Sequence, residues 1–196
     1  MTLTTNNPLK KFVIGLKRQF IDERQLTPDA QQQLQLDRAG LPMNDPGPAA
    51  VAAAGIAWLK RSQEMAQHHD GGSARDYSLI KGWSSSYPET TGYIVPTILD
   101  YADLTKDKEL VDCGRRMLDW LVSIQFPEGG FQGGKIDAVP RVPVTFNTGQ
   151  ILIGLAAGVR HFGDKYRPSM NLAANWLRDS LDSDGCWRKY PTPFAT

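Results

Sequence analysis

One phrase that occurs twice constrains the fold of this chain most. Residues 91–94, Thr-Gly-Tyr-Ile, return 57 residues later as residues 148–151, Thr-Gly-Gln-Ile. Each phrase opens an apolar run with i, i+1, i+4, i+5, i+8 spacing, which is one face of an amphipathic helix. The two runs are Ile94, Val95, Ile98, Leu99, Ala102 and Ile151, Leu152, Leu155, Ala156, Val159. A fixed period of this length predicts a repeated pair of elements.

The second helix of each pair also occurs twice. An apolar stripe surrounds Trp120, and a similar stripe surrounds Trp176, 56 residues later. Eleven residues after each tryptophan comes another aromatic, Phe131 or Trp187, preceded by a glycine-containing turn. A looser copy lies around Trp58. Its Gln63 follows the tryptophan at the same distance as Gln125 follows Trp120. Each unit is therefore predicted to be a helix, a short turn, a second helix and a Gly-rich loop that ends in an aromatic.

The remaining pattern sets the expected elements. Pro96 would cost about 3 kcal/mol in a helix interior, so we expect the helix around it to begin near Val95 or with an irregular first turn. We expect residues 1–48 to form an N-terminal helical segment and connector, and residues 49–196 a helical-hairpin repeat domain, continuous as one domain. The other expected helices are residues 8–24, 49–67, 108–125, 146–162 and 165–181, with a helix start at Pro28 and a long loop at 126–143.

Composition excludes several classes of function. The chain has 196 residues, a net charge of +1 and 41% hydrophobic residues, as soluble globular proteins do. This near-neutral charge gives no support for nucleic acid or an anionic membrane as partner. The apolar run at residues 12–16 is too short and its flanks too charged for a membrane span. Two cysteines in different units indicate a reducing, cytoplasmic location.

No metal or cofactor site is expected. Cys113 lies on the apolar stripe of a helix, where a core role is favoured over metal ligation. Cys186 lies in a turn with no histidine nearby in the sequence. His68 and His69 are adjacent, so on a helix their side chains would diverge and could not share one metal ion. The phosphate-binding and nucleophile motifs with fixed glycine spacing are also absent.

Paired helices at this period, with turns such as residues 125–131 and 184–187, resemble the α/α toroids. This group includes terpenoid cyclases, protein prenyltransferases, six-hairpin glycosidases, sugar epimerases and polysaccharide lyases. The resemblance covers roughly residues 49–190 and implies an all-α fold, an α/α toroid. Six hairpins would need about 340 residues, so the resemblance implies an incomplete ring. We expect the chain to self-associate or to be a piece of a longer protein.

In the sugar-active members of this group, the cleft lies where the inner helices begin. By this resemblance Glu89 is the candidate general acid or base. Aromatic faces stack on sugars, and Arg, Asn and Gln side chains hydrogen-bond to their polar groups. The candidate substrate-binding residues are Trp83, Tyr87, Gln132, Arg141, Asn147, Gln150, Trp187, Lys189 and Tyr190. The alternative is structural: the aromatics would fill gaps between hairpins, and Glu89 would favour a helix N-terminus.

Three functions remain open. The first is a carbohydrate-active protein: a hydrolase, lyase or epimerase acting on a polysaccharide or its precursor, with a glycan or small-molecule substrate. Glycoside hydrolysis usually needs two carboxylates, and the further candidates, Glu128 and Asp137, lie in the long loop. The second is a terpenoid-cyclase relative acting on an isoprenoid, although the Asp-x-Asp-Asp motif of squalene-type cyclases is missing. The third is a non-catalytic repeat scaffold.

Two physical expectations concern the core. Trp120 and Trp176 are predicted to be buried at corresponding places between helices. Gly92 and Gly149 are predicted to lie at corresponding helix starts, where the backbone approaches a neighbour or the cleft.

Overall fold

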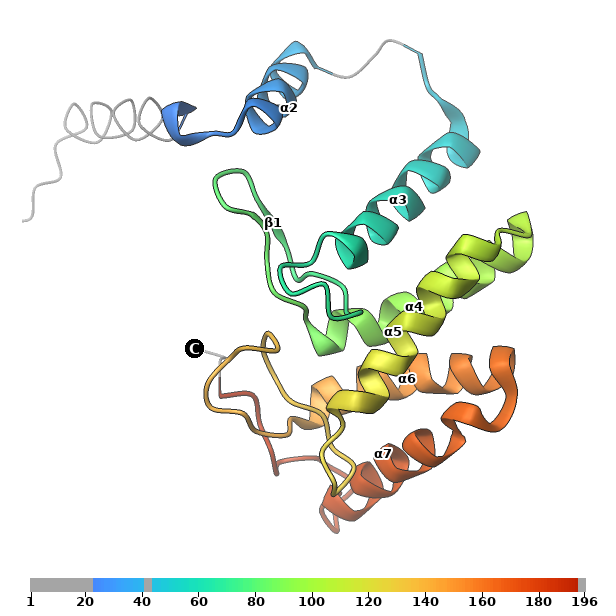
Figure 1. Cartoon of the computed structure of the whole chain (residues 1–196). Helices are drawn as coiled ribbons and strands as arrows, with labels where there is room; N and C mark the ends of the chain where they lie inside the picture. Colours follow the sequence, from blue (N-terminus) through green and yellow to red (C-terminus); the bar gives the residue numbers. More distant parts are fainter. Residues whose placement is uncertain (1–22, 41–43, 194–196) are drawn as a thin grey trace, which may run out of the picture. The chain divides into compact units, whose positions relative to one another are not determined.

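The computed structural model describes residues 23–40 and 44–193, and regular structure there is mostly helical (Figure 1). The helices are α2 (Pro28–Ala39), α3 (Gly47–Glu64), α4 (Pro88–Thr105), α5 (Lys108–Ile124), α6 (Thr145–Phe162), the 3-10 helix η1 (Gly163–Tyr166) and α7 (Arg167–Ser180). Two short strands, β1 (Tyr77–Ser78) and β2 (Gly82–Trp83), pair as a hairpin. Most of the expected helix at residues 8–24 lies outside the described residues.

The chain divides into two compact units. One comprises residues 1–45 and 78–82, and the other comprises residues 46–77 and 83–196. In the described part of the first unit, Thr27 caps α2 by accepting a hydrogen bond from the Ala30 N–H. The predicted helix start at Pro28 is therefore confirmed. None of the helices in the described ranges is long and apolar enough to cross a membrane.

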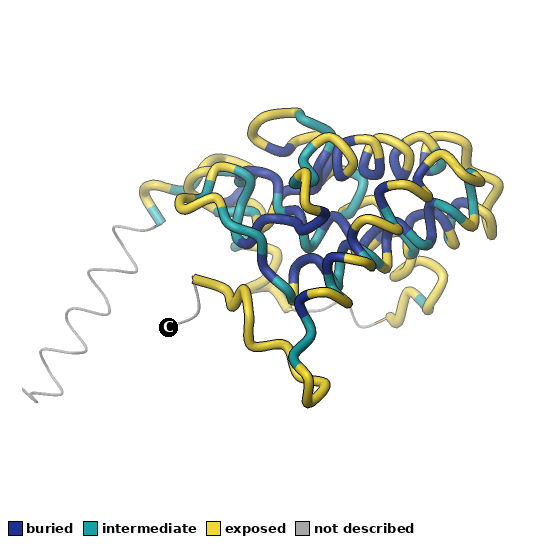
Figure 2. Tube along the Cα trace, turned by 90° about the horizontal axis from the view of Figure 1, so that it is seen from below, coloured by how far each residue is buried: buried dark blue, intermediate teal, exposed yellow. Residues whose placement is uncertain are grey.

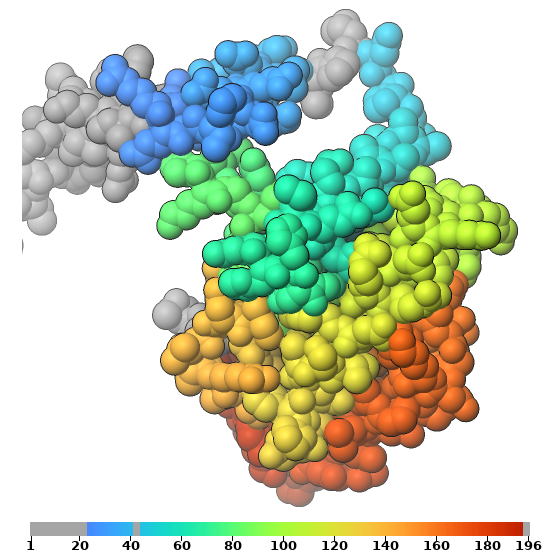
Figure 3. All heavy atoms as spheres, viewed as in Figure 1, coloured from blue at the N-terminus to red at the C-terminus, as the bar shows by residue number. Residues whose placement is uncertain are grey.

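In the second unit each helix packs against helices that are near it in the sequence. α4 packs against α5 and α6, α6 packs against α7, and α3 packs against α4 and α5. Figure 3 shows α3, α5 and α7 following one another from teal through yellow-green to orange-red. Figure 2 shows buried stretches along the helices, and the loop residues 72–74 and 129–133 are buried as well. The largest fully buried aliphatic residues include Ile98, Met117, Leu118, Leu121, Ile151 and Leu155.

Two glycines let α4 and α6 approach closely. A Cβ on Gly92 would lie 2.5 Å from the Ile151 Cα, and a Cβ on Gly154 would collide with the Gly92 carbonyl group. That carbonyl has no helical donor four residues on, because Pro96 lacks an N–H. The expectation that Pro96 delays the helix start was wrong: α4 begins at Pro88 and contains Pro96. Gly149 does not approach a neighbour in this way, because an added Cβ there would meet nothing within 4 Å.

Two threonines fasten the loops to the starts of α4 and α6. The Thr91 hydroxyl accepts from the Ser73 N–H (2.8 Å) and donates to the Tyr87 carbonyl (2.9 Å). The Thr148 hydroxyl accepts from the Phe131 N–H (2.9 Å) and donates to the Val144 carbonyl (2.9 Å). Both threonines are fully buried, so each hydroxyl satisfies a loop N–H that water does not reach.

Two glutamines make a second pair of matching contacts. The Gln63 amide donates to the carbonyls of Gly71 (3.0 Å) and Cys113 (2.9 Å). The Gln125 amide donates to the carbonyls of Gly129 (2.9 Å) and Ser169 (3.1 Å). Gln63 thus joins the end of α3 to its loop and to α5, and Gln125 joins the end of α5 to its loop and to α7.

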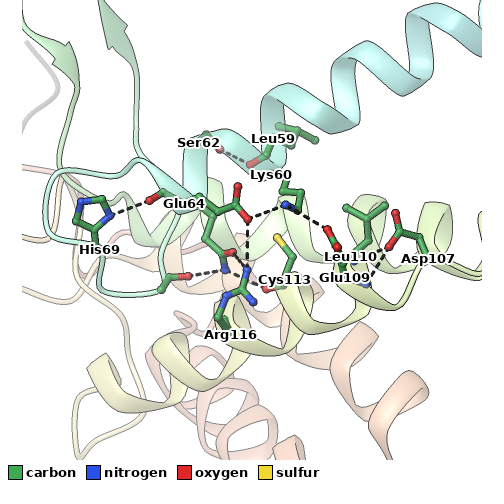
Figure 4. A network of polar contacts seen from close by, with 12 residues as sticks. Leu59, Lys60, Ser62, Glu64, His69, Asp107, Glu109, Leu110, Cys113 and Arg116 are labelled. Carbon is green, nitrogen blue, oxygen red and sulfur yellow. Dashed lines mark hydrogen bonds and ion pairs between the residues drawn. The ribbon is translucent and has the colours of Figure 1, made fainter.

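Charged side chains surround the first of these glutamines (Figure 4). Arg116 donates to the Gln63 side-chain oxygen (3.0 Å), and Lys60 pairs with Glu64 (2.8 Å). Cys113 lies beneath them, fully buried, and burial raises the pKa of its thiol to about 11. Its place in the core is as expected, and the described residues contain no cluster of His, Cys, Asp and Glu suited to a metal ion.

The predicted burial of both tryptophans is confirmed. Trp120 is 6% exposed and Trp176 is 9% exposed. Each ring lies against a glycine: a Cβ on Gly72 would come within 2.6 Å of the Trp120 ring, and one on Gly130 within 2.9 Å of the Trp176 ring. A side chain larger than hydrogen at either glycine would displace the indole.

Candidate functional site

The starts of α4 and α6 bring Glu89 and Asn147 into contact. The Asn147 side-chain amide donates to the Glu89 carboxylate at 3.1 Å. Burial raises the pKa of the Glu89 carboxyl above its usual value, and a hydrogen bond from Tyr87 partly opposes this rise. A carboxyl group whose pKa is moved toward neutrality is better suited to general acid or base catalysis. The structure thus brings together three of the residues predicted from sequence.

Tyr87 completes this cluster, and a cation that the sequence did not reveal, Arg75, lies near its ring. Burial raises the pKa of the Tyr87 phenol, and the nearby charge of Glu89 raises it further. The guanidinium of Arg75 lies 5.9 Å from the centre of the Tyr87 ring. Arg75 also lies near Asp76, at 3.5 Å. Arg75 belongs to an irregular loop, so neither periodicity nor the repeated phrase marks it.

A second group of predicted residues lines a groove beside the start of α6. Trp187, Lys189 and Tyr190 face Thr145 and Phe146 across a space of about 370 Å³. The Thr145 hydroxyl donates to the Lys189 carbonyl (2.8 Å), which fixes this loop to the helix. Tyr190 packs on Trp176 with ring centres 4.9 Å apart. Trp187 is 51% exposed, and its indole N–H donates to the Leu177 carbonyl (2.8 Å).

The other predicted site residues have structural surroundings. Trp83 packs against Trp58 (4.7 Å between ring centres) and Tyr77 (5.0 Å), which matches the gap-filling interpretation. Gln132 is buried, and its amide donates to the carbonyls of Lys135 and Ile136. Among the described residues, its side-chain oxygen has no hydrogen-bond partner.

Two predicted residues lie outside both groups. The guanidinium of Arg141 lies 5.1 Å from the Phe126 ring centre. Gln150 is partly buried on α6. Within the part of the chain that the structure describes, no hydrogen bond or ion pair joins Arg141 or Gln150 to Glu89 or to Trp187, Lys189 and Tyr190.

Asp137, one of the two further acids, is held as a carboxylate. Its oxygen accepts a hydrogen bond from the Ser85 hydroxyl at 2.6 Å, and this bond keeps the pKa of Asp137 below its usual value. His68 approaches the same oxygen at 3.9 Å. Glu128, the other acid considered from sequence, lies exposed in the turn before Gly129. The pKa of Asp137 in the long loop is therefore lowered, whereas the pKa of the Glu89 carboxyl is raised.

Comparisons of this chain with protein-family models, with curated proteins and with solved structures found no match.

Proposed function

We propose that this chain is an incomplete α/α toroid that binds carbohydrate at the rim where α4 and α6 begin. The observation that carries the proposal is the contact between Glu89 and Asn147 beside Tyr87, with the raised pKa of the Glu89 carboxyl. The toroid part rests on the matching hydrogen bonds of Thr91 and Thr148, which tie each loop to the next inner helix in the same way.

Within this proposal, Glu89 transfers a proton to or from the sugar. A single carboxyl group beside a phenol suits the proton abstraction of a lyase or an epimerase. A hydrolase needs a second carboxylate, and Asp137 is the candidate because Ser85 keeps it ionised. We place the protein in the cytoplasm, with a glycan or a small sugar as substrate and no nucleic acid or membrane as partner.

An alternative function has an observation of its own. An apolar groove of about 680 Å³ lies between α3 and α4, with Trp58 and Tyr101 among its lining residues. Such a groove suits an isoprenoid better than a sugar, as a terpenoid-cyclase relative would require. Glu89, the carboxyl with a raised pKa, does not line this groove, however.

The test combines a glycan array with turnover of the glycans that bind. Glu89→Gln keeps the shape and the contact to Asn147 but cannot ionise. We expect it to bind within a few-fold of wild type and to lose about 10²–10⁴-fold in turnover. Trp187→Ala should weaken binding, because its exposed face is the stacking surface. Glu128→Gln, an exposed acid outside both groups, is the control. Absence of any glycan binding, or unchanged turnover in Glu89→Gln, would refute the proposal.

A further inference from the structure

The helices of the second unit alternate between two layers. We call α4 and α6 inner, because they pack on each other and on the remaining helices, and we call α3, α5 and α7 outer. In chain order the layers read outer, inner, outer, inner, outer. α4 packs against both α5 and α6, so it fills the groove between an outer helix and the inner helix that follows it. The inference below uses the hairpin correspondence proposed above, and not the Glu89 site.

The two inner helices have equal length and correspond position by position, 57 residues apart. Their burial differs on one side. Gly154 and Ala157 are buried on α6, and Gly154 lies against the Gly92 carbonyl of α4, whereas the corresponding Thr97 and Asp100 are exposed on α4. On α6, this side is covered by α4. The corresponding side of α4, which carries Thr97 and Asp100, is open in the described part of the chain.

This open side of α4 and the neighbouring face of α3 enclose the apolar groove. Its lining residues are Ala52, Gly55, Ile56, Trp58, Leu59, Thr97, Asp100, Tyr101 and Leu104. Leu104 is 78% exposed and Trp58 is 46% exposed. In the hairpin correspondence, α3 matches α5 and α4 matches α6. The groove between α3 and α4 therefore matches the groove between α5 and α6, which α4 itself fills. Continuity with that interface indicates a helix as occupant.

The groove has room for one helix without a second helix attached. α3 already takes the outer place beside it. If a second copy inserted its α6 into the groove, the α7 attached to that helix would collide with α3 of the first copy. The two outer helices would need the same place beside the groove. Thr97 also stands where α6 has Gly154, so an occupant cannot approach α4 there as closely as α4 approaches α6. Long apolar side chains are needed to span that wider gap.

The negative charge of Asp100 at the groove favours basic residues on the polar edge of the bound helix. Asp100 lines the groove and is exposed. Asp103 follows three residues later on α4, and its carboxylate lies 3.3 Å from the His161 ring nitrogen Nδ1 of α6. A Lys or Arg side chain beside the apolar face of the occupant would meet Asp100, and acidic residues there would be repelled.

We propose that the groove between α3 and α4 binds one amphipathic helix of a partner protein, with large apolar residues on one face and Lys or Arg along its edge. Such helix-in-groove recognition uses apolar anchors at i, i+3, i+4 and i+7. Trp58 and Leu104 are the surfaces that receive these anchors.

The experiment uses the full chain and two labelled peptides as long as α4, 18 residues. Both carry Leu and Phe at i, i+3, i+4 and i+7; one has Lys along the edge and the other has Glu. Fluorescence anisotropy measures binding. Gly55→Trp blocks the groove, and its Cβ has open space, so the fold is expected to remain. Val122→Trp, at a half-exposed position of α5 outside the groove, is the matched control.

We expect the Lys peptide to bind and Gly55→Trp to weaken it by about tenfold or more, with Val122→Trp unchanged. Asp100→Lys should reverse the preference between the two peptides. Binding by neither peptide, or equal losses in Gly55→Trp and Val122→Trp, overturns the proposal. Sedimentation then separates a groove covered by a second copy, which gives a dimer, from one covered within a monomer.

Discussion

Replacement of Thr148 by valine tests whether the buried threonines hold the loops to the inner helices. Valine has nearly the same shape but no hydroxyl, so the Phe131 N–H loses its acceptor. Phe131 is fully buried, and water cannot replace that acceptor without a rearrangement. An unsatisfied buried N–H destabilises a protein by about 1–3 kcal/mol. The Val144 carbonyl keeps a partner, because it also accepts from the Thr148 N–H, so its contribution to the loss is small.

Thr91→Val should have the same effect, because it removes the acceptor of the buried Ser73 N–H. The assay is urea unfolding followed by tryptophan fluorescence. With an m-value of about 2 kcal/mol/M, each loss lowers the midpoint by about 0.5–1.5 M. Thr105→Val is the control: its hydroxyl bonds to the Tyr101 carbonyl at an exposed helix end, so about 0.5 kcal/mol or less is expected. A loss that small for Thr148→Val would refute the reasoning.

Two further predictions use other parts of the structure. Trp120→Ala and Trp176→Ala should each destabilise by about 3–5 kcal/mol in the same assay, whereas the exposed Trp187→Ala should lose about 1 kcal/mol or less. Similar losses in all three would show that burial does not set the cost. Because burial raises the pKa of Glu89, wild type should lose stability relative to Glu89→Gln as the pH rises from below 4.5 through the raised pKa. A difference between the two proteins that does not change with pH would contradict the raised pKa.

The helices were predictable because they carry a periodic apolar pattern. The range expected for the second outer helix, 108–125, matches α5 within a residue, and burial of Trp120 and Trp176 followed from the same stripes. The start of α4 was not predictable from that pattern. A proline at 96 opposes a helix interior, yet α4 continues through it, with the Gly92 carbonyl lying against Gly154 of α6.

The glycine pair at 71 and 72 was also missed. Its role corresponds to that of Gly129 and Gly130, since a side chain at Gly72 or Gly130 would strike Trp120 or Trp176. The signal was present as Gly-Gly in both loops. It was hidden because the loop after Trp58 is longer than the loop after Trp120, which breaks the constant spacing that sequence comparison uses.

The candidate site was predicted only in part, for a reason that the two inner helices share. Glu89 corresponds to Phe146, and Asn147 corresponds to Thr90, so the contact joins neighbouring positions of two corresponding turns. One residue further on, the threonines and glycines are identical in both helices.

The two identical threonines perform the same structural task, because each fixes a loop. The neighbouring positions differ, and there an acid on α4 meets an amide on α6. A repeated phrase thus identifies the residues that hold the helix starts together. The residues with distinct chemistry lie beside that phrase, where the two copies diverge, and only the packing of α4 on α6 shows which of them touch.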